Sequence, residues 1–306
     1  MKVCFIGLGK SGAAAAFTLQ ISGLAREIAL VDADVNLASR EAARLMHGSS
    51  LTACRKIYGG GKEMIDGADI VIITNDVLQR VNPKLADTVN AGTVVFREVI
   101  DDIRKSRLPQ NAILIVAANP VDIMTQIAVD ARILPPDQVI GTGTLLDTVR
   151  FRSLIAEYFS VDPMSVSALI LGEHGGCIVP VWSSVSINGV PIESFPSYNE
   201  KKLKDMFKSA AKTWHGMITL KNDDGWAFGL AICELVAAVA MDKRKVMPIS
   251  TLQNGAFGIK GICLSLPTVV GRSGVQGVIE IKLRQNERKL LRKSEEMLRT
   301  KLAQLN

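Results

Sequence analysis

The sequence has few of the features that mark secreted, metal-binding or membrane proteins. Its five cysteines among 306 residues are odd in number and scattered, and no Cys-x-x-Cys pair occurs. This pattern indicates neither a disulfide framework nor a zinc site, so we expect no metal and a reducing, cytoplasmic location. No apolar run approaches the roughly 20 residues of a membrane span, and the apolar stretch before Gly7 is too short for a signal peptide.

Acidic residues are in slight deficit, and the resulting net charge of +6 is local. The segment 282–301 carries eight basic and three acidic residues, which accounts for five of the six charges. Leucines recur there at helical spacing and predict an amphipathic helix with one solvated face: Leu283, Leu290, Leu291, Leu298, Leu302 and Leu305. Aromatic residues that could stack on bases are missing nearby, so we expect no nucleic-acid partner and no membrane partner.

The first half of the chain alternates short apolar runs with helical stretches. The runs predict strands at Val3–Gly7, Ile28–Asp32, Asp69–Thr74, Ala112–Ala118 and Val139–Gly141. Helices are expected between them at Ser11–Leu24, Val35–Leu45, Pro83–Ser106 and Val121–Arg132. This alternation is typical of an α/β fold with a doubly wound parallel sheet.

The alternation stops after about Thr144. A long helix at Asp147–Phe159 and strands at Val166–Leu171, Val185–Asn188 and Val278–Leu283 are expected beyond it. We therefore predict a dinucleotide-binding domain over residues 1–141 and an α+β catalytic domain over residues 142–306.

A glycine motif follows the first predicted strand and opens a helix. It reads Gly7-Leu8-Gly9-Lys10-Ser11-Gly12, and Asp32 ends the second strand twenty residues later. In this context the glycines allow a pyrophosphate to approach the backbone at a helix N-terminus, and the acid binds the adenine ribose. The carboxylate repels a 2′-phosphate, so the motif favours NAD over NADP in a Rossmann-type sheet.

Two further segments hold residues suited to acid–base chemistry on a carboxylate-bearing substrate. His174 can exchange a proton near neutral pH, and an aspartate such as Asp147 would fix its tautomer. Arg150 lies one helical turn after Asp147 and can clamp a carboxylate through two parallel hydrogen bonds. Spacing alone leaves two alternatives open, namely a polar loop histidine and a simple ion pair within the helix.

Several motifs occur in the order and at the spacing of a known family. They are the glycine motif with Asp32, Ala118-Asn119-Pro120-Val121-Asp122-Ile123, the segment from Val139 to Arg150, and Leu171-Gly172-Glu173-His174-Gly175. With them the chain closely resembles the L-lactate/malate dehydrogenase superfamily, particularly the L-lactate and L-2-hydroxyisocaproate dehydrogenases. The resemblance covers nearly the whole chain, including Pro248–Thr251 and Leu264–Pro267.

The resemblance implies an NAD-dependent L-2-hydroxyacid dehydrogenase, active on a small 2-oxo or 2-hydroxy acid. It makes His174 the proton donor and acceptor, Asp147 the residue that orients it, and Arg150 the binder of the substrate carboxylate. Asn119 would contact substrate and nicotinamide through a cis Asn119–Pro120 bond, and Thr74 and Asn75 would lie beside the cofactor. Relatives are dimers or tetramers, so a homo-oligomer is also implied.

Two segments depart from the family pattern. The loop after Thr74 lacks the arginine that polarises the substrate carbonyl in relatives; Lys84 is our first candidate for its role and Arg80 the second, although both could be solvated loop cations. Asp224 falls where a threonine of relatives faces the substrate side chain, unless it faces solvent or caps the next helix. A carboxylate there would repel oxaloacetate.

These departures keep two alternatives open besides the lactate-type enzyme. One is a malate dehydrogenase, although such enzymes use a loop arginine for the second carboxylate. The other is a dinucleotide-binding protein whose catalysis is impaired because the loop arginine is absent.

Overall fold

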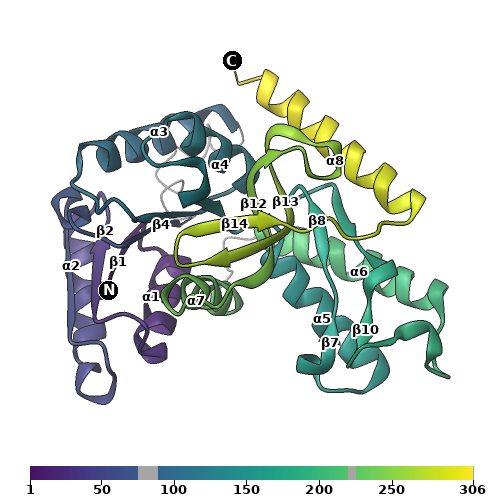
Figure 1. The fold of residues 1–306 in the computed structure, drawn as a ribbon. Coiled ribbons are helices and arrows are strands. Elements are labelled where there is room, and N and C mark those ends of the chain that lie inside the picture. The colour runs from purple at the N-terminus through teal and green to yellow at the C-terminus, as the bar shows by residue number, and fades with distance from the viewer. Residues whose placement is uncertain (75–88, 220–224, 306) are drawn as a thin grey trace.

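A large mixed sheet runs through the whole protein (Figure 1). The computed structural model describes residues 1–74, 89–219 and 225–305. In the main sheet the strand order is β3-β2-β1-β4-β5-β6-β12-β13-β8-β9, with β14 paired to β13. Its strands are β1 (Lys2–Ile6), β2 (Glu27–Val31), β3 (Lys56–Gly60), β4 (Ile70–Thr74), β5 (Ile113–Ala117), β6 (Val139–Gly141), β8 (Ile170–Gly172), β9 (Ile178–Pro180), β12 (Lys245–Asn254), β13 (Lys260–Gly271) and β14 (Gly274–Val278).

The first six strands are parallel and follow the Rossmann order. The predicted parallel sheet is therefore confirmed, but β3 was missed. It contains two adjacent glycines and few large apolar residues, so it does not resemble a buried strand. Gly59 is needed there because a Cβ atom would lie 2.1 Å from the carbonyl oxygen of Ala38 in the neighbouring helix.

The sheet does not stop where the predicted first domain ends. Strand β12 pairs with β6 in antiparallel fashion at Ser250 and Gly141, and β12 and β13 form a long hairpin. Neither hairpin strand was predicted, because each carries a proline, and Pro248 lies opposite Pro267. Proline cannot donate a ladder hydrogen bond and is unusual inside a sheet. The second half of the chain is thus joined to the first through one continuous sheet.

Helices cover both faces of this sheet. They are α1 (Lys10–Ser22), α2 (Val35–Met46), α3 (Val89–Lys105), α4 (Val121–Asp130), α5 (Leu145–Phe159), α7 (Trp226–Ala240) and α8 (Gln285–Ala303). Helix α6 (Glu200–Thr219) packs instead on α5, in a third core that Leu203 and Phe207 share with Phe151. Helices α3 and α4 lie on one face, and α1 and α7 lie side by side on the other (Figure 1).

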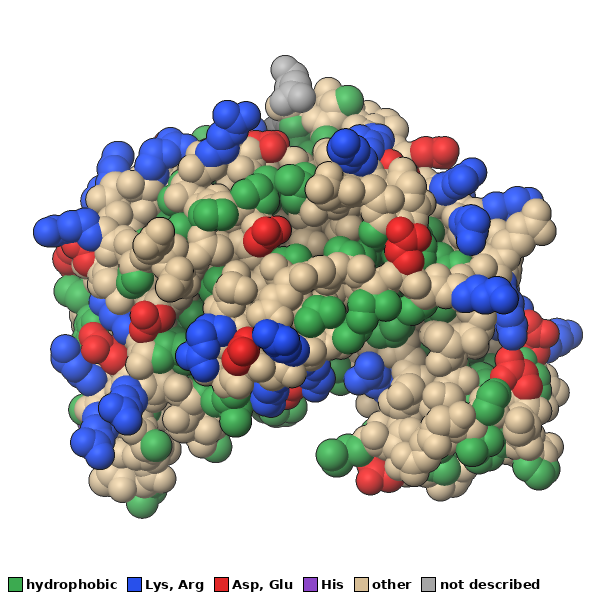
Figure 2. Space-filling view, in the orientation of Figure 1, with side chains coloured by type: hydrophobic (Ala, Val, Ile, Leu, Met, Phe, Trp, Pro, Cys, Tyr) green, Lys and Arg blue, Asp and Glu red, His purple; other side chains and the backbone are tan. Residues whose placement is uncertain are grey.

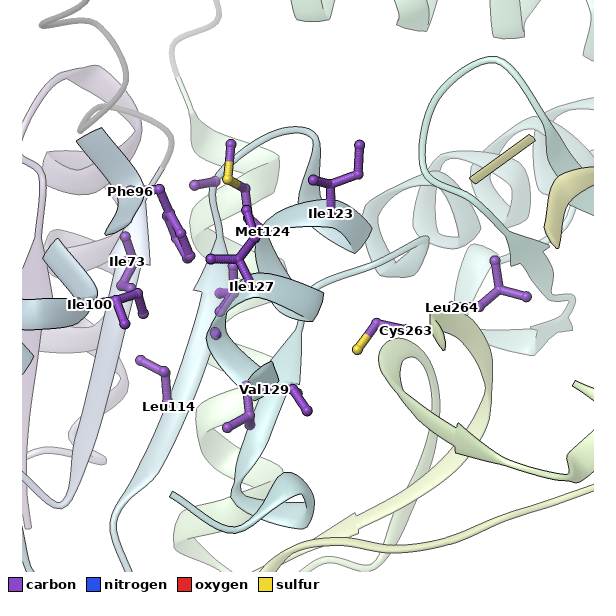
Figure 3. Packing of buried hydrophobic residues seen from close by; sticks show 14 of the residues in the cluster. Ile73, Phe96, Ile100, Leu114, Ile123, Met124, Ile127, Val129, Cys263 and Leu264 are labelled. Carbon is purple, nitrogen blue, oxygen red and sulfur yellow. The ribbon is translucent and has the colours of Figure 1, made fainter. Parts of the chain in front are cut away.

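Side chains alternate between the two cores, as expected for a strand buried on both faces. In β1, Cys4 and Ile6 join the α3–α4 core, whereas Val3 and Phe5 join the α1–α7 core. Figure 3 shows the first of these cores, with Phe96, Ile100 and Ile73 on one side of α4, and Cys263 and Leu264 on its other side.

The remaining corrections concern the second half. The predicted strand Val166–Leu171 is two strands, because β7 (Val166–Ser167) joins a small second sheet with β10 (Ser186–Ile187) and β11 (Val190–Pro191). The predicted strand Val278–Leu283 is also wrong, since β14 ends at Val278.

The predicted basic helix is present as α8. Leu291 and Leu298 are buried, but Leu290 is 45% exposed, because it lies one residue off the buried stripe. Lys and Arg side chains gather on the exposed side of α8, away from the buried leucines (Figure 2). Across the described residues, no helix is both long and apolar enough to cross a membrane.

Candidate active site

The glycine motif forms the turn from β1 into α1. Gly7 has φ 98°, a conformation that favours glycine. The carboxylate of Asp32 accepts hydrogen bonds from the backbone N–H groups of Leu8, at 2.9 Å, and Asp34, at 3.0 Å. Asp32 therefore fastens the glycine turn to the end of β2.

The N-terminus of α1 is built to accept an anion. Lys10 begins the helix after Gly9, which provides no side-chain cap, and the first turn holds no acidic residue. Helix N–H groups and the helix dipole favour a phosphate at such an end. Helix α7 packs closely behind, because a Cβ atom on Gly225 would lie 2.8 Å from the Cα atom of Ser11.

Thr74 ends β4 on the other side of the glycine turn. Its buried hydroxyl donates to the carbonyl oxygen of Gly7 at 2.9 Å. The predicted cofactor residues Gly7 to Gly12, Asp32 and Thr74 thus meet at the carboxyl ends of β1, β2 and β4. In doubly wound sheets this edge, where the strand order reverses, is the usual ligand site.

His174 and Asp147 form a buried pair, although they lie far apart in the sequence. Nδ1 of His174 lies 2.6 Å from Oδ2 of Asp147, and the two side chains are 11% and 5% exposed. Asp147 is in the first turn of α5, and His174 follows β8. The predicted His–Asp pair is therefore present.

Several charges act on the pKa of His174. Burial pushes it down, but the charge of Asp147 and the hydrogen bond with it, together with the charge of Asp122, raise the pKa above its usual 6.5, against the repulsion of Arg150. The imidazole is thus biased toward the protonated state near neutral pH.

Arg150 lies one turn further along α5. Its buried Nη1 has no hydrogen-bond partner among the described residues. The alternative of an ion pair between Asp147 and Arg150 is not found within the described part of the chain, where Asp147 pairs with His174. A buried guanidinium nitrogen without a partner is costly unless a ligand completes it.

Asn119 follows β5 and precedes a cis peptide bond to Pro120, as expected. Three residues later, Asp122 accepts a hydrogen bond from the backbone N–H of His174 at 2.8 Å. This contact brings the end of β5 next to the His174 loop. Asp122 belongs to the motif from Ala118 to Ile123, but it was not predicted as a site residue.

Helix α8 holds the His174 loop from the other side. The N–H of Glu173 donates to Oγ of Ser294 at 2.7 Å, and the Glu173 carboxylate, 3% exposed, pairs with Lys301. The sulfur of Cys177 lies 3.5 Å from that of Met297. Since Ser294, Met297 and Lys301 lie on one helical face, this face braces the loop.

Four predicted residues lie outside the described residues. They are Asn75, Arg80, Lys84 and Asp224. Their roles therefore stay predictions.

Comparisons with known proteins cover the entire chain. Residues 1–141 match the family model of the lactate/malate dehydrogenase NAD-binding domain, and residues 144–306 match its alpha/beta C-terminal domain. The chain belongs to the lactate/malate dehydrogenase family. This confirms the predicted family, its fold class and its NAD cofactor, while the boundary at residue 141 remains a prediction.

Individual members of this dehydrogenase family are similar to the chain over nearly its full length. An L-lactate dehydrogenase from Salinibacter ruber is 37% identical, covering 99% of this chain and 97% of that protein. One from Synechococcus is 36% identical, covering 98% and 97%. The crystal structure of a minor L-lactate dehydrogenase from Enterococcus mundtii, with ligands bound, superposes with a TM-score of 0.92 at 30% identity, covering 100% of this chain and 98% of that one.

Proposed function

We propose that this NAD-dependent 2-hydroxyacid dehydrogenase reversibly reduces a small, pyruvate-like 2-oxo acid, with His174 as proton donor and acceptor. One observation carries the proposal: the buried His174–Asp147 pair lies beside an Arg150 nitrogen that no described residue satisfies. A proton donor beside an unsatisfied cation suits a carbonyl that carries a carboxylate. The relatives named above are lactate dehydrogenases, which favours this substrate class over oxaloacetate and malate.

The residues at the edge of the sheet fit NAD. The turn at Gly7 and the N-terminus of α1 suit a pyrophosphate, because Gly9 at the N-cap position has no side chain that could occupy this end of the helix. Asp32 has a carboxylate at the end of β2, where it suits ribose hydroxyls and repels a 2′-phosphate. We assign Leu8, Lys10, Ser11 and Gly12 to the same binding segment, with Thr74, Asn75 and Asn119 at the nicotinamide end. When bound, NADH supplies the hydride for the substrate's C2 atom.

The protein's contribution to the reaction is proton transfer and orientation. The carboxylate of Asp147 accepts a hydrogen bond from Nδ1–H of His174 and so leaves Nε2 directed to the substrate. In reduction, Nε2–H donates its proton to the oxygen of the forming hydroxyl; in oxidation, neutral Nε2 removes it. The raised pKa of His174 favours the protonated form, which is the proton donor in reduction.

Arg150 holds the substrate carboxylate through its guanidinium group, and Asn119 positions the carbonyl from the end of β5. Lys84 supplies the positive charge that polarises the carbonyl, in place of the arginine of relatives. To Asp224 we assign the selection against a second carboxylate on the substrate. These last two assignments rest on the sequence alone.

A kinetic panel tests the function. NADH oxidation is followed with pyruvate, oxaloacetate, and branched, aromatic and amino-bearing 2-oxo acids, using wild type, His174→Ala and Lys84→Ala. We expect turnover of one substrate class, abolished by the first substitution and sharply reduced by the second. Saturable NADH binding without turnover on any substrate would instead favour the dinucleotide-binding protein, and a preference for oxaloacetate would favour malate.

We also propose a homo-oligomer that uses the outer surface of α1 and α7. Four apolar side chains there are each more than half exposed: Phe17, Ile21, Trp226 and Leu230. The two helices lie side by side (Figure 1), so these residues form one apolar surface suited to a symmetric contact. Light scattering should give a dimer or tetramer that Leu230→Glu dissociates and Met164→Glu, at an exposed site elsewhere, does not; a monomeric wild type would contradict this.

The cysteines support a cytoplasmic location, which we propose as well. All five are free thiols in the structure, as is usual for proteins of reducing compartments. Reaction with a thiol reagent after gentle isolation tests this, since five titratable thiols in the denatured protein are expected.

A further inference from the structure

Asp122 is a buried carboxylate directly beneath the His174 loop. It lies in the first turn of α4 and is 1% exposed. Its Oδ2 accepts the hydrogen bond from the N–H of His174. Its Oδ1 makes no hydrogen bond of good geometry within the described part of the chain, and neither does the buried hydroxyl of Ser250 on β12. The two groups are nevertheless close enough for the hydroxyl to lower the pKa of the carboxyl.

This arrangement is unfavourable for the fold itself. Burial raises the pKa of Asp122 to about 6, which is partly offset by the nearby hydroxyl of Ser250, by the hydrogen bond from the His174 backbone and by the positive charge of His174, while the charge of Glu173 adds to the increase. Above that pH the folded protein keeps an incompletely paired negative charge in its interior, where charged groups are disfavoured. A neutral residue of the same shape would avoid this penalty, so stability does not explain an aspartate here.

The charge lies where it can act on proton transfer. His174 is flanked by two carboxylates, with Asp147 on its ring and Asp122 on its peptide N–H. Both raise the pKa of His174, against burial and the charge of Arg150. The next peptide upstream is held by Ser294, so the backbone that carries the imidazole is fixed from both sides.

We propose that Asp122 is a positioning residue that fixes the peptide of His174 and, through its negative charge, favours the imidazolium that donates the proton. The assignment rests on the proposed function, since it needs His174 to be the acid. Asp122 itself touches neither substrate nor cofactor in this role. It acts through His174, from the first turn of α4.

The test compares Asp122→Asn, which keeps the shape but removes the charge, with wild type. Asp130→Asn, the same substitution at an exposed position of α4, is the matched control. The readouts are the pH dependence of kcat/KM for pyruvate reduction, the Kd for NADH, and Tm at pH 8. We expect the alkaline limb of the profile to move to lower pH in Asp122→Asn, with kcat/KM above it falling about tenfold for each pH unit of displacement. NADH affinity should not change, and Tm should equal or exceed that of wild type.

An unmoved profile in a folded Asp122→Asn protein would overturn the proposal. So would a loss of activity that parallels a lower Tm while the profile keeps its midpoint, since that is a merely structural effect. If Asp122→Asn does not fold, Ser250→Ala decides. Removing the hydroxyl should raise the pKa of Asp122, so that Asp122 is neutral over more of the pH range in which His174 titrates, and the alkaline limb should move to lower pH. An unmoved limb overturns the proposal. Failure of the proposed function is distinguishable, because it leaves wild type without turnover or His174→Ala active.

Discussion

Replacing Asp147 by asparagine should impair pyruvate reduction most strongly at alkaline pH. The substitution keeps the size of the side chain but removes the charge 2.6 Å from Nδ1 of His174. Burial, which lowers the pKa of His174, is then opposed by Asp122 alone. Because only the protonated imidazole can donate, the active fraction of the enzyme should fall above the new pKa.

The size of the effect follows from the buried hydrogen bond. A hydrogen bond to a charged group contributes about 1.5–3 kcal/mol, and one pKa unit corresponds to about 1.36 kcal/mol. The pKa of His174 should therefore fall by about 1–2 units in Asp147→Asn. Above both midpoints, kcat/KM for pyruvate should decrease about 10- to 100-fold, and this loss should shrink as the pH is lowered.

The assay is the pH profile of kcat/KM at saturating NADH, with Asp162→Asn as an exposed control on the loop after α5. NADH affinity, measured by fluorescence, should be the same in all three proteins. A loss that is independent of pH, with the midpoint in place, would refute the reasoning. It would mean that Asp147 orients the ring but does not set its pKa.

Three further outcomes are expected. Arg150→Gln removes two charge-assisted hydrogen bonds, together about 3 kcal/mol, so KM for pyruvate should rise about 100-fold while the Kd for NADH stays constant; an unchanged KM would exclude Arg150 as the carboxylate binder. Lys301→Met leaves the Glu173 carboxylate buried without its cation, and urea unfolding should report a loss of about 1–3 kcal/mol, reduced because Lys301 is 38% exposed, with Lys301→Arg restoring most of it. The contribution of Asp122 to wild-type stability should fall as the pH rises from about 4 to about 6, because the fold raises the pKa of Asp122 from 3.8 to about 6, a difference worth about 3 kcal/mol. The raised pKa of His174 acts in the same direction above pH 6.5, and a pH-independent Asp122→Asn difference from wild type would contradict this linkage.

The parallel part of the fold could be predicted because each of its strands except β3 is a continuous apolar run. Val3 to Gly7 and Ala112 to Ala118 have the length and the β-branched content of strands buried on both faces. The hairpin of β12 and β13 could not be recognised in the same way. Pro248 and Pro267 interrupt its two strands, and they lie opposite each other across the hairpin.

The chemical residues of the site were found by residue type and by family resemblance. The resemblance also gave the pairing of Asp147 with His174, but the contact of Asp122 with the His174 loop was not predicted, since it joins distant parts of the chain. Asp147 and His174 are 27 residues apart, and Asp122 and His174 are 52 apart. Spacing along one helix suggested an Asp147–Arg150 pair as an alternative, but tertiary packing turns Asp147 toward His174 instead.

In the structure, the burial of α4 points to Asp122. Every residue of α4 from Val121 to Val129 is buried, so the helix has no solvated face on which an acid would be unremarkable. An acidic residue in a helix that packs on all sides must be paired with a partner, be neutralised by a proton, or have a function that needs its charge. Its pairing with a peptide N–H in the loop of His174 meets only part of that requirement, because one carboxylate oxygen finds no partner of good geometry in the described structure. Because this oxygen lacks such a partner, the role of Asp122 lies in proton transfer and not in the stability of the fold.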